Sequence, residues 1–63
     1  MIARKIIESL VETYVYVYIK NIGKEFGGIL KSINEFDNVI IQDKNENLIY
    51  IPLSEISVIT ERR

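Results

Sequence analysis

The stretch from residue 13 to residue 33 reads TYVYVYIKNIGKEFGGILKSI and decides the fold. Its first part, residues 13–20, alternates tyrosines with β-branched residues, which is the period-two pattern of a β-strand. A turn follows, and a second strand is predicted over 25–33 with Gly27 and Gly28 in its interior. Paired glycines within a strand indicate a sharp bend or a bulge, a feature that curls sheets into barrels. These residues therefore predict a strongly bent antiparallel sheet.

Hydrophobic periodicity predicts the remaining elements on either side of this stretch. Apolar pairs repeat every four residues over 2–12, which predicts an amphipathic helix. Short β-branched runs between polar turns predict three further strands, over 39–42, 48–51 and 56–59. Pro52 lacks an N–H for a ladder and ends the fourth strand, so one helical turn is expected before the fifth. We expect one mainly β domain over residues 1–63, with a helix followed by a five-stranded, SH3-like small barrel.

The composition excludes several classes of function. The chain has no cysteine and no histidine, which excludes disulfides, thiolate or imidazole metal sites and Ser-His-Asp triads. Asp43, Asn45 and Asn47 resemble the start of a calcium loop, but Leu48 and Ser54 stand where that loop needs glycine and glutamate. The serines lack a base, and the carboxylates form no recognisable acid/base pair. We therefore expect a protein that is not an enzyme and binds no metal or cofactor.

Size and charge constrain the partners. A domain this small buries only about 60% of its unfolded surface and usually needs disulfides, a metal or a partner subunit. Oligomerisation is the remaining means of stabilisation. The net charge of −1 argues against binding to duplex DNA, and the apolar run at 14–19 is too short to span a bilayer. We expect a soluble cytoplasmic protein that associates with copies of itself, and neither with duplex DNA nor with a membrane.

Two segments carry a recognisable motif. Residues 19–30, IKNIGKEFGGIL, show a strand leading into Gly-basic-x-aromatic-x-Gly-x-Leu. Residues 34–43, NEFDNVIIQD, show an Asp-x-x-x-Asn turn before a hydrophobic strand, with Asn34 in place of the usual Asp. This pattern resembles the first motif of the Sm-like family of small RNA-binding barrels, which includes Hfq. The resemblance covers about residues 2–59 and implies a Sm-like barrel whose subunits close into a ring of usually six or seven.

The resemblance also implies a site for single-stranded RNA, U-rich or A-rich, at the turn over 34–38. In the relatives, the residue at the Phe36 position stacks on a base and the residue at the Asn38 position hydrogen-bonds a base edge. Asn34 belongs to the same turn. An alternative interpretation is that Phe36 plugs the end of the barrel and Asn38 caps its own turn through its side chain.

Basic residues are scarce where the family carries them. The second motif of the relatives contains Arg-Gly or Lys-His, whereas residues 52–56 of this chain read PLSEI. Lys24 and Lys31 are weaker candidates for phosphate contacts, or else part of a solvated surface. A second hypothesis therefore stays open, in which the chain is an SH3-like barrel that acts as a structural or protein-interaction module and binds no RNA.

The ends of the predicted sheet are candidates for subunit contacts. An edge strand presents unpaired N–H and C=O groups, and in the relatives the fourth strand of one subunit pairs with the fifth strand of the next. The resemblance therefore implies an oligomer interface formed by Leu48, Ile49, Tyr50, Ile51, Ile56, Ser57, Val58 and Ile59.

The first predicted strand carries three tyrosines on one face. Tyr14, Tyr16 and Tyr18 are spaced by two residues, so their rings lie along the same side of the strand. They could form a stacking platform for a single-stranded nucleic acid. The alternative, which we favour, is packing under the helix or a subunit interface, because tyrosine suits surfaces that are apolar at one end and wet at the other.

Overall fold

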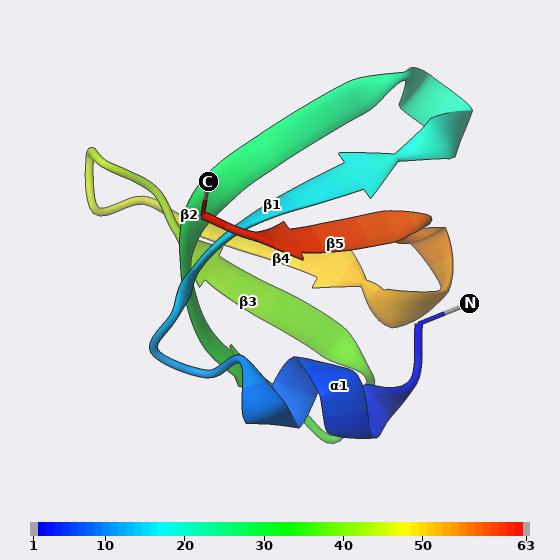
Figure 1. The fold of residues 1–63 in the computed structure, drawn as a ribbon, viewed down its shortest axis with the longest axis horizontal. Helices are drawn as coiled ribbons and strands as arrows, with labels where there is room; N and C mark the ends of the chain where they lie inside the picture. Colours follow the sequence, from blue (N-terminus) through cyan, green and yellow to red (C-terminus); the bar gives the residue numbers. More distant parts are fainter. Residues whose placement is uncertain (1, 63) are drawn as a thin grey trace.

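A computed structural model describes residues 2–62, which form one short helix followed by five antiparallel strands of a single sheet (Figure 1). In chain order the elements are α1 (Arg4–Ser9), β1 (Tyr14–Ile19), the 3-10 turn η1 (Lys20–Ile22), β2 (Lys24–Ile33), β3 (Asn38–Gln42), β4 (Leu48–Pro52), the 3-10 turn η2 (Leu53–Glu55) and β5 (Val58–Glu61). Among residues 2–62 the strand order is β4-β3-β2-β1-β5, so β4 and β5 are the two edges and do not pair with each other. The predicted helix followed by five antiparallel strands is confirmed, in a sheet that stays open.

The long strand β2 is shared by the two halves of the sheet. Its first part pairs with β1, from Lys24 opposite Ile19 onward, and its second part pairs with β3. The register shifts between Leu30 and Ser32, so the bulge lies at Lys31 and not at the glycine pair. The curvature of β2 is visible in Figure 1. β2 therefore bends as predicted, but its bulged residue, Lys31, lies four positions after Gly27.

The glycine pair allows two close approaches instead of forming the bulge. Gly28 is buried opposite Val15, and a Cβ at this position would lie 2.5 Å from the carbonyl oxygen of Gln42 and 2.6 Å from Cγ2 of Ile41. Gly27 faces the other side, where a Cβ would lie 3.0 Å from the ring of Tyr16. The backbones of β2 and β3 thus approach closely only because residue 28 lacks a side chain.

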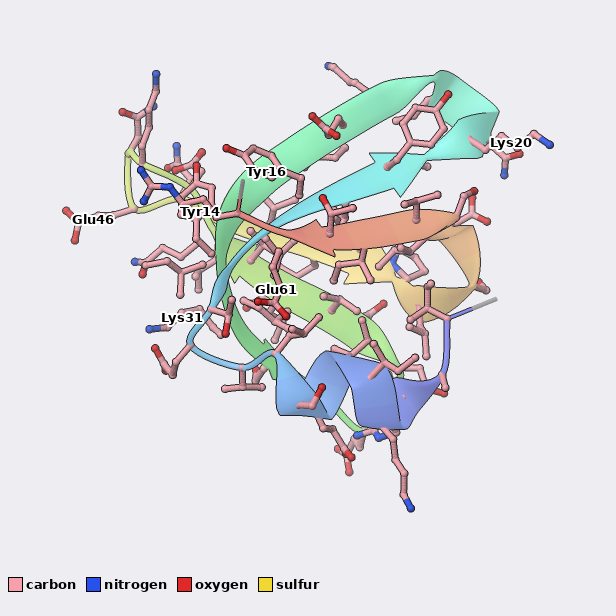
Figure 2. All side chains as sticks on the ribbon, viewed as in Figure 1. Tyr14, Tyr16, Lys20, Lys31, Glu46 and Glu61 are labelled. Atoms are coloured by element: carbon pink, nitrogen blue, oxygen red, sulfur yellow. The ribbon has the colours of Figure 1, made fainter. Side chains whose placement is uncertain are left out.

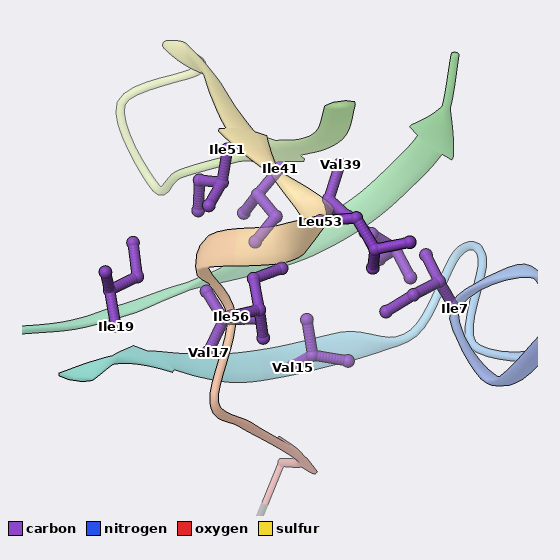
Figure 3. Packing of buried hydrophobic residues seen from close by; sticks show 10 residues of the cluster. Ile7, Val15, Val17, Ile19, Val39, Ile41, Ile51, Leu53 and Ile56 are labelled. Atoms are coloured by element: carbon purple, nitrogen blue, oxygen red, sulfur yellow. The ribbon is translucent and has the colours of Figure 1, made fainter. Parts of the chain in front are cut away.

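The hydrophobic core lies inside the curled sheet, between the strands, α1 and η2 (Figure 3). The period-two prediction for β1 is confirmed, because alternate residues of the strand are buried and the tyrosines face outward. One buried side chain comes from α1, and two come from η2 and the residue after it. The buried hydrophobic residues are Ile7, Val15, Val17, Ile19, Leu30, Val39, Ile41, Ile51, Leu53 and Ile56.

The helix is shorter than the predicted 2–12 because the chain has to turn into β1. Glu12 has a φ of 71°, which lies in the left-handed region and ends the helical path. Its N–H donates to the carbonyl oxygen of Leu30 at 2.7 Å, and the N–H of Thr13 donates to that of Leu10 at 3.0 Å. The last predicted turn of the helix is therefore replaced by a loop bonded to β2. No helix among residues 2–62 is long and apolar enough to cross a membrane.

The fifth strand begins two residues later than the predicted 56–59. The predicted helical turn is present as η2, and the N–H of Ile56 donates back to the carbonyl oxygen of Leu53 at 3.2 Å. The side chain of Ile56 is buried in the core. Regular pairing with β1 starts at Val58, opposite Tyr18. The apolar character of Ile56 therefore reflects its place in the core and not membership of a strand.

Candidate nucleic-acid interface

The turn between β2 and β3 is closed by the side chain of Asn34. Its Oδ1 accepts the backbone N–H of Phe36 at 3.0 Å and that of Asn38 at 2.9 Å. Backbone bonds from Asn34 N–H to the Asn38 carbonyl at 3.0 Å, and from Asp37 N–H to the Asn34 carbonyl at 3.1 Å, complete the turn. Asp37 is left-handed, with a φ of 60°. The Oδ1 of Asn34 is thus engaged in shaping the turn.

Phe36 and Asn38 present unused groups on this turn. Phe36 is 76% exposed, so the interpretation that it plugs the end of a barrel is wrong. Asn34, and not Asn38, provides the side-chain cap. The Asn38 side chain makes no hydrogen bond within residues 2–62, and no unpaired side-chain N or O atom there is buried. An exposed aromatic ring and a free amide therefore lie two residues apart on an anchored turn.

The segment that replaces the basic second motif lies beside this turn. Asn38 is opposite Pro52 in the β3–β4 pairing, and the N–H of Leu53 donates to the carbonyl oxygen of Asp37 at 2.8 Å. Leu53 is buried and Ser54 is exposed. The turn at 34–38 and the segment at 52–54 are therefore neighbours in space, but residues 52–54 contribute a hydroxyl group and no positive charge.

A positive charge instead reaches the turn from α1. Nη1 of Arg4 donates to the carbonyl oxygen of Asn34 at 3.2 Å and to Oδ1 of Asp37, while Nε donates to Oε2 of Glu8 at 3.2 Å. Figure 1 shows α1 beside the connection between β2 and β3. The contact of Arg4 with this turn was not predicted from the sequence, because Arg4 lies 33 positions from Asp37 and no spacing rule joins a helix to so distant a turn.

Lys24 and Lys31 do not join this group. The Nζ of Lys24 lies 5.8 Å from the centroid of the Phe26 ring, at the opposite end of β2 from the turn. The Nζ of Lys31 lies 3.5 Å from a carboxylate oxygen of Glu12 (Figure 2 labels Lys31). Both lysines are therefore held by local contacts away from Phe36.

The same five-residue hairpin occurs between β3 and β4. Oδ1 of Asp43 accepts the N–H groups of Asn45 and Asn47, each at 2.9 Å, and Glu46 has a left-handed φ of 65°. The N–H of Asn47 is the main cause that holds the pKa of Asp43 below its ordinary value of 3.8; desolvation opposes it, and the N–H of Asn45 adds to the lowering. Within residues 2–62 no cluster of three His, Cys, Asp or Glu side chains is placed to hold a metal ion. This loop is therefore a hairpin built like the turn at 34–38.

Comparison with known proteins assigns no family to this arrangement. Searches against protein-family models and against curated proteins find no match to the chain. Because the Asx-x-x-x-Asn pattern occurs in both hairpins, it marks a turn geometry rather than a binding site. The features that distinguish the turn at 34–38 are the exposed ring of Phe36 and the guanidinium of Arg4.

The edge strands expose apolar side chains. Leu48 and Tyr50 on β4 are 51% and 57% exposed, and Val58 on β5 is 49% exposed. β4 contains no charged residue. Ile51 and Ile56, which were expected in an oligomer interface, are buried in the core, so their side chains are not available to another subunit.

An apolar hollow opens beside the inner side of β4. Its volume is about 280 Å³. The lining comes from the end of β1, from η1, from β2, and from β4 with η2. The lining residues are Ile19, Ile22, Phe26, Ile49, Tyr50, Ile51, Pro52 and Glu55.

The three tyrosines of β1 lie on the outer face of the sheet. Tyr14 and Tyr16, labelled in Figure 2, meet edge to face with ring centroids 5.6 Å apart. The guanidinium of Arg62 lies 5.2 Å from the centroid of the Tyr14 ring. The ring of Tyr16 covers Gly27. Packing under the helix is therefore excluded, because the core and α1 lie on the opposite face of β1.

Proposed function

We propose that this chain is a Sm-like small barrel that forms a homo-oligomeric ring in the cytoplasm and binds single-stranded RNA, U-rich or A-rich, without catalysis. The observation that carries the proposal is that an exposed Phe36 ring and a free Asn38 amide lie two residues apart on a turn anchored by Asn34. Base stacking on an aromatic ring contributes about 1–3 kcal/mol per base, and an amide can both donate to and accept from a base edge.

The two unpaired edges support assembly into a ring. Within the described residues 2–62, β4 and β5 each have only one neighbouring strand, and both expose apolar side chains. Natural edge strands usually carry charges or proline along their length to prevent pairing, whereas β4 has only a terminal Pro52. Pairing of β4 with β5 of another copy is heterologous, and it closes into a ring, with six or seven subunits expected.

Assembly compensates for the weakness of a single site. In one subunit, the aromatic ring of residue 36 and the amide of residue 38, with little positive charge nearby, supply only a few kcal/mol of binding free energy. An oligomeric ring presents several copies of the turn to one RNA molecule, so each base after the first binds at high effective concentration. RNA affinity is therefore expected to depend on the oligomer.

Native mass spectrometry with and without oligo-U and oligo-A tests this function, because it measures ring size and RNA occupancy together. In fluorescence anisotropy at low salt, Phe36→Ala and Asn38→Ala should each weaken binding about tenfold, or ~1.4 kcal/mol, without dissolving the ring. Asn47→Ala is the matched control, because Asn47 holds the position of Asn38 in the second hairpin. Absence of binding by the parent, or equal binding by the variants at positions 36 and 38, refutes the site.

A second candidate function is that of a protein-interaction module without RNA. The observation that favours it is the charge around Phe36, which is flanked in sequence by the carboxylates of Glu35 and Asp37, with no cation at residues 52–56. A monomer at micromolar concentration that binds neither homopolymer supports this alternative.

A further inference from the structure

We infer that Arg4 is the phosphate-binding residue of this interface and that Asp37 occupies its guanidinium until RNA displaces it. This inference rests on the function proposed above. Residues 52–56 lack a positive charge, and in this inference a residue of α1 provides it instead. The ribose-phosphate backbone of the bound RNA then runs between the turn and the helix.

The geometry places Arg4 within reach of both the turn and solvent. Its side chain is 40% exposed, and it donates to Asn34 and Asp37 from the same Nη1. No hydrogen bond is made by its Nη2 within residues 2–62. A guanidinium binds phosphate through two parallel N–H groups. For a phosphate, Arg4 therefore offers Nη2, which is free, and Nη1, which it shares with the carboxylate of Asp37.

Asp37 is an anion that a phosphate can replace. Its side chain is 61% exposed, so rotation into solvent restores its hydration at little cost. The bond from Arg4 to the Asn34 carbonyl does not require Asp37 and can hold the guanidinium at the turn during the exchange. The exchange leaves one anion bonded to Nη1 before and after, because the phosphate takes the place of the Asp37 carboxylate while Glu8 stays bonded to Nε.

This competition predicts opposite effects for the two partners. Arg4→Gln removes the phosphate ligand, so RNA affinity should fall about five- to tenfold and the salt slope should decrease by about 0.7 for each lost contact. Asp37→Asn removes the competing anion, so affinity should rise about threefold or more and the salt slope should not fall. If Arg4 and Asp37 only held the turn in shape, both substitutions would weaken binding.

Two control variants separate this effect from general electrostatics. Lys44→Gln removes one positive charge from the second hairpin, where Lys44 is exposed, and should change affinity less than twofold. Glu35→Gln removes a carboxylate next to Phe36 that has no bond to Arg4 within residues 2–62. It should strengthen binding less than Asp37→Asn does. The double variant Arg4→Gln/Asp37→Asn should have the same RNA affinity as Arg4→Gln alone, because the two effects are coupled.

The experiment is fluorescence anisotropy of labelled oligo-U and oligo-A at four salt concentrations on the assembled protein, after thermal unfolding has shown each variant to be folded. Opposite shifts for Arg4→Gln and Asp37→Asn, with coupling in the double variant, support the inference. The inference about Arg4 is overturned, while the proposed function is kept, if the parent binds RNA and Phe36→Ala weakens binding but Arg4→Gln matches Lys44→Gln in affinity and salt slope. If the parent does not bind RNA, both the proposed function and this inference are overturned.

Discussion

Replacing Gly28 by alanine tests the account of the bend most directly. The added carbon would lie 2.5 Å from the carbonyl oxygen of Gln42 and 2.6 Å from Cγ2 of Ile41. The carbon–carbon distance to Ile41 is far below the contact distance of about 3.5–4.0 Å, and the carbon–oxygen distance to Gln42 is shorter still. Ile41 is fully buried and the other atom belongs to the backbone of β3, so neither can move without disturbing the sheet.

The expected cost is large for so small a domain. Overpacking of a core costs about 1–3 kcal/mol, and Gly28→Ala should lie near ~2–3 kcal/mol because one clash is with backbone. The whole domain has about 3–9 kcal/mol of stability at ~0.05–0.15 kcal/mol per residue. One kcal/mol shifts the melting temperature by about 4–8 °C in domains of this size, so a decrease of roughly 10–20 °C is expected. Gly28→Val should be worse, since its branched side chain adds two further methyl groups.

Thermal unfolding followed by circular dichroism measures this effect, with Gly27→Ala as the matched control. The same methyl group at residue 27 meets the Tyr16 ring at 3.0 Å, and this ring lies on the outer face where it can shift. The control should therefore cost less than about 1 kcal/mol. A melting temperature of Gly28→Ala within 2 °C of the parent, or a larger loss for Gly27→Ala, would refute the close approach of β2 and β3.

Three further predictions concern the second hairpin and the sheet edge. Glu46 is exposed with a left-handed φ of 65°, so Glu46→Gly should raise stability by about 0.5–1 kcal/mol in denaturant unfolding; a loss would contradict the strain. The pKa of Asp43 is lowered in the folded state relative to 3.8, so its carboxylate stabilises the fold above about pH 4 and this stabilisation disappears as the pH falls through the lowered pKa. Asp43→Asn should therefore show a smaller loss of melting temperature between pH 7 and pH 2 than the parent, and an identical loss would exclude this role. Tyr50→Lys should dissociate the proposed ring in light scattering, because it adds a charge to an apolar edge, whereas Ile6→Lys, at a comparably exposed position on α1, should leave the ring assembled; equal behaviour would exclude pairing through β4.

The sequence by itself determined the elements whose residues respond to local physics. Alternation over residues 14–19 produces β1 because β-branched and aromatic side chains suit a pleated surface with one buried face. Pro52 ends β4 because it has no N–H for the ladder. The Asn34 hairpin was predictable as a turn, because an Asx side chain bonds to backbone groups within four residues.

Only the tertiary structure decided features that depend on residues far apart in the chain. Ile56 looks like a strand residue in sequence, yet it fills the core beside η2, since hydrophobic burial does not depend on which element provides the side chain. The bulge lies at Lys31, because register depends on the partner strand as well as on β2. The contact between Arg4 and Asp37 joins a helix to a turn 33 residues away. Local patterns cannot contain such a pairing, because it exists only after the bend of β2 has brought the turn beside α1.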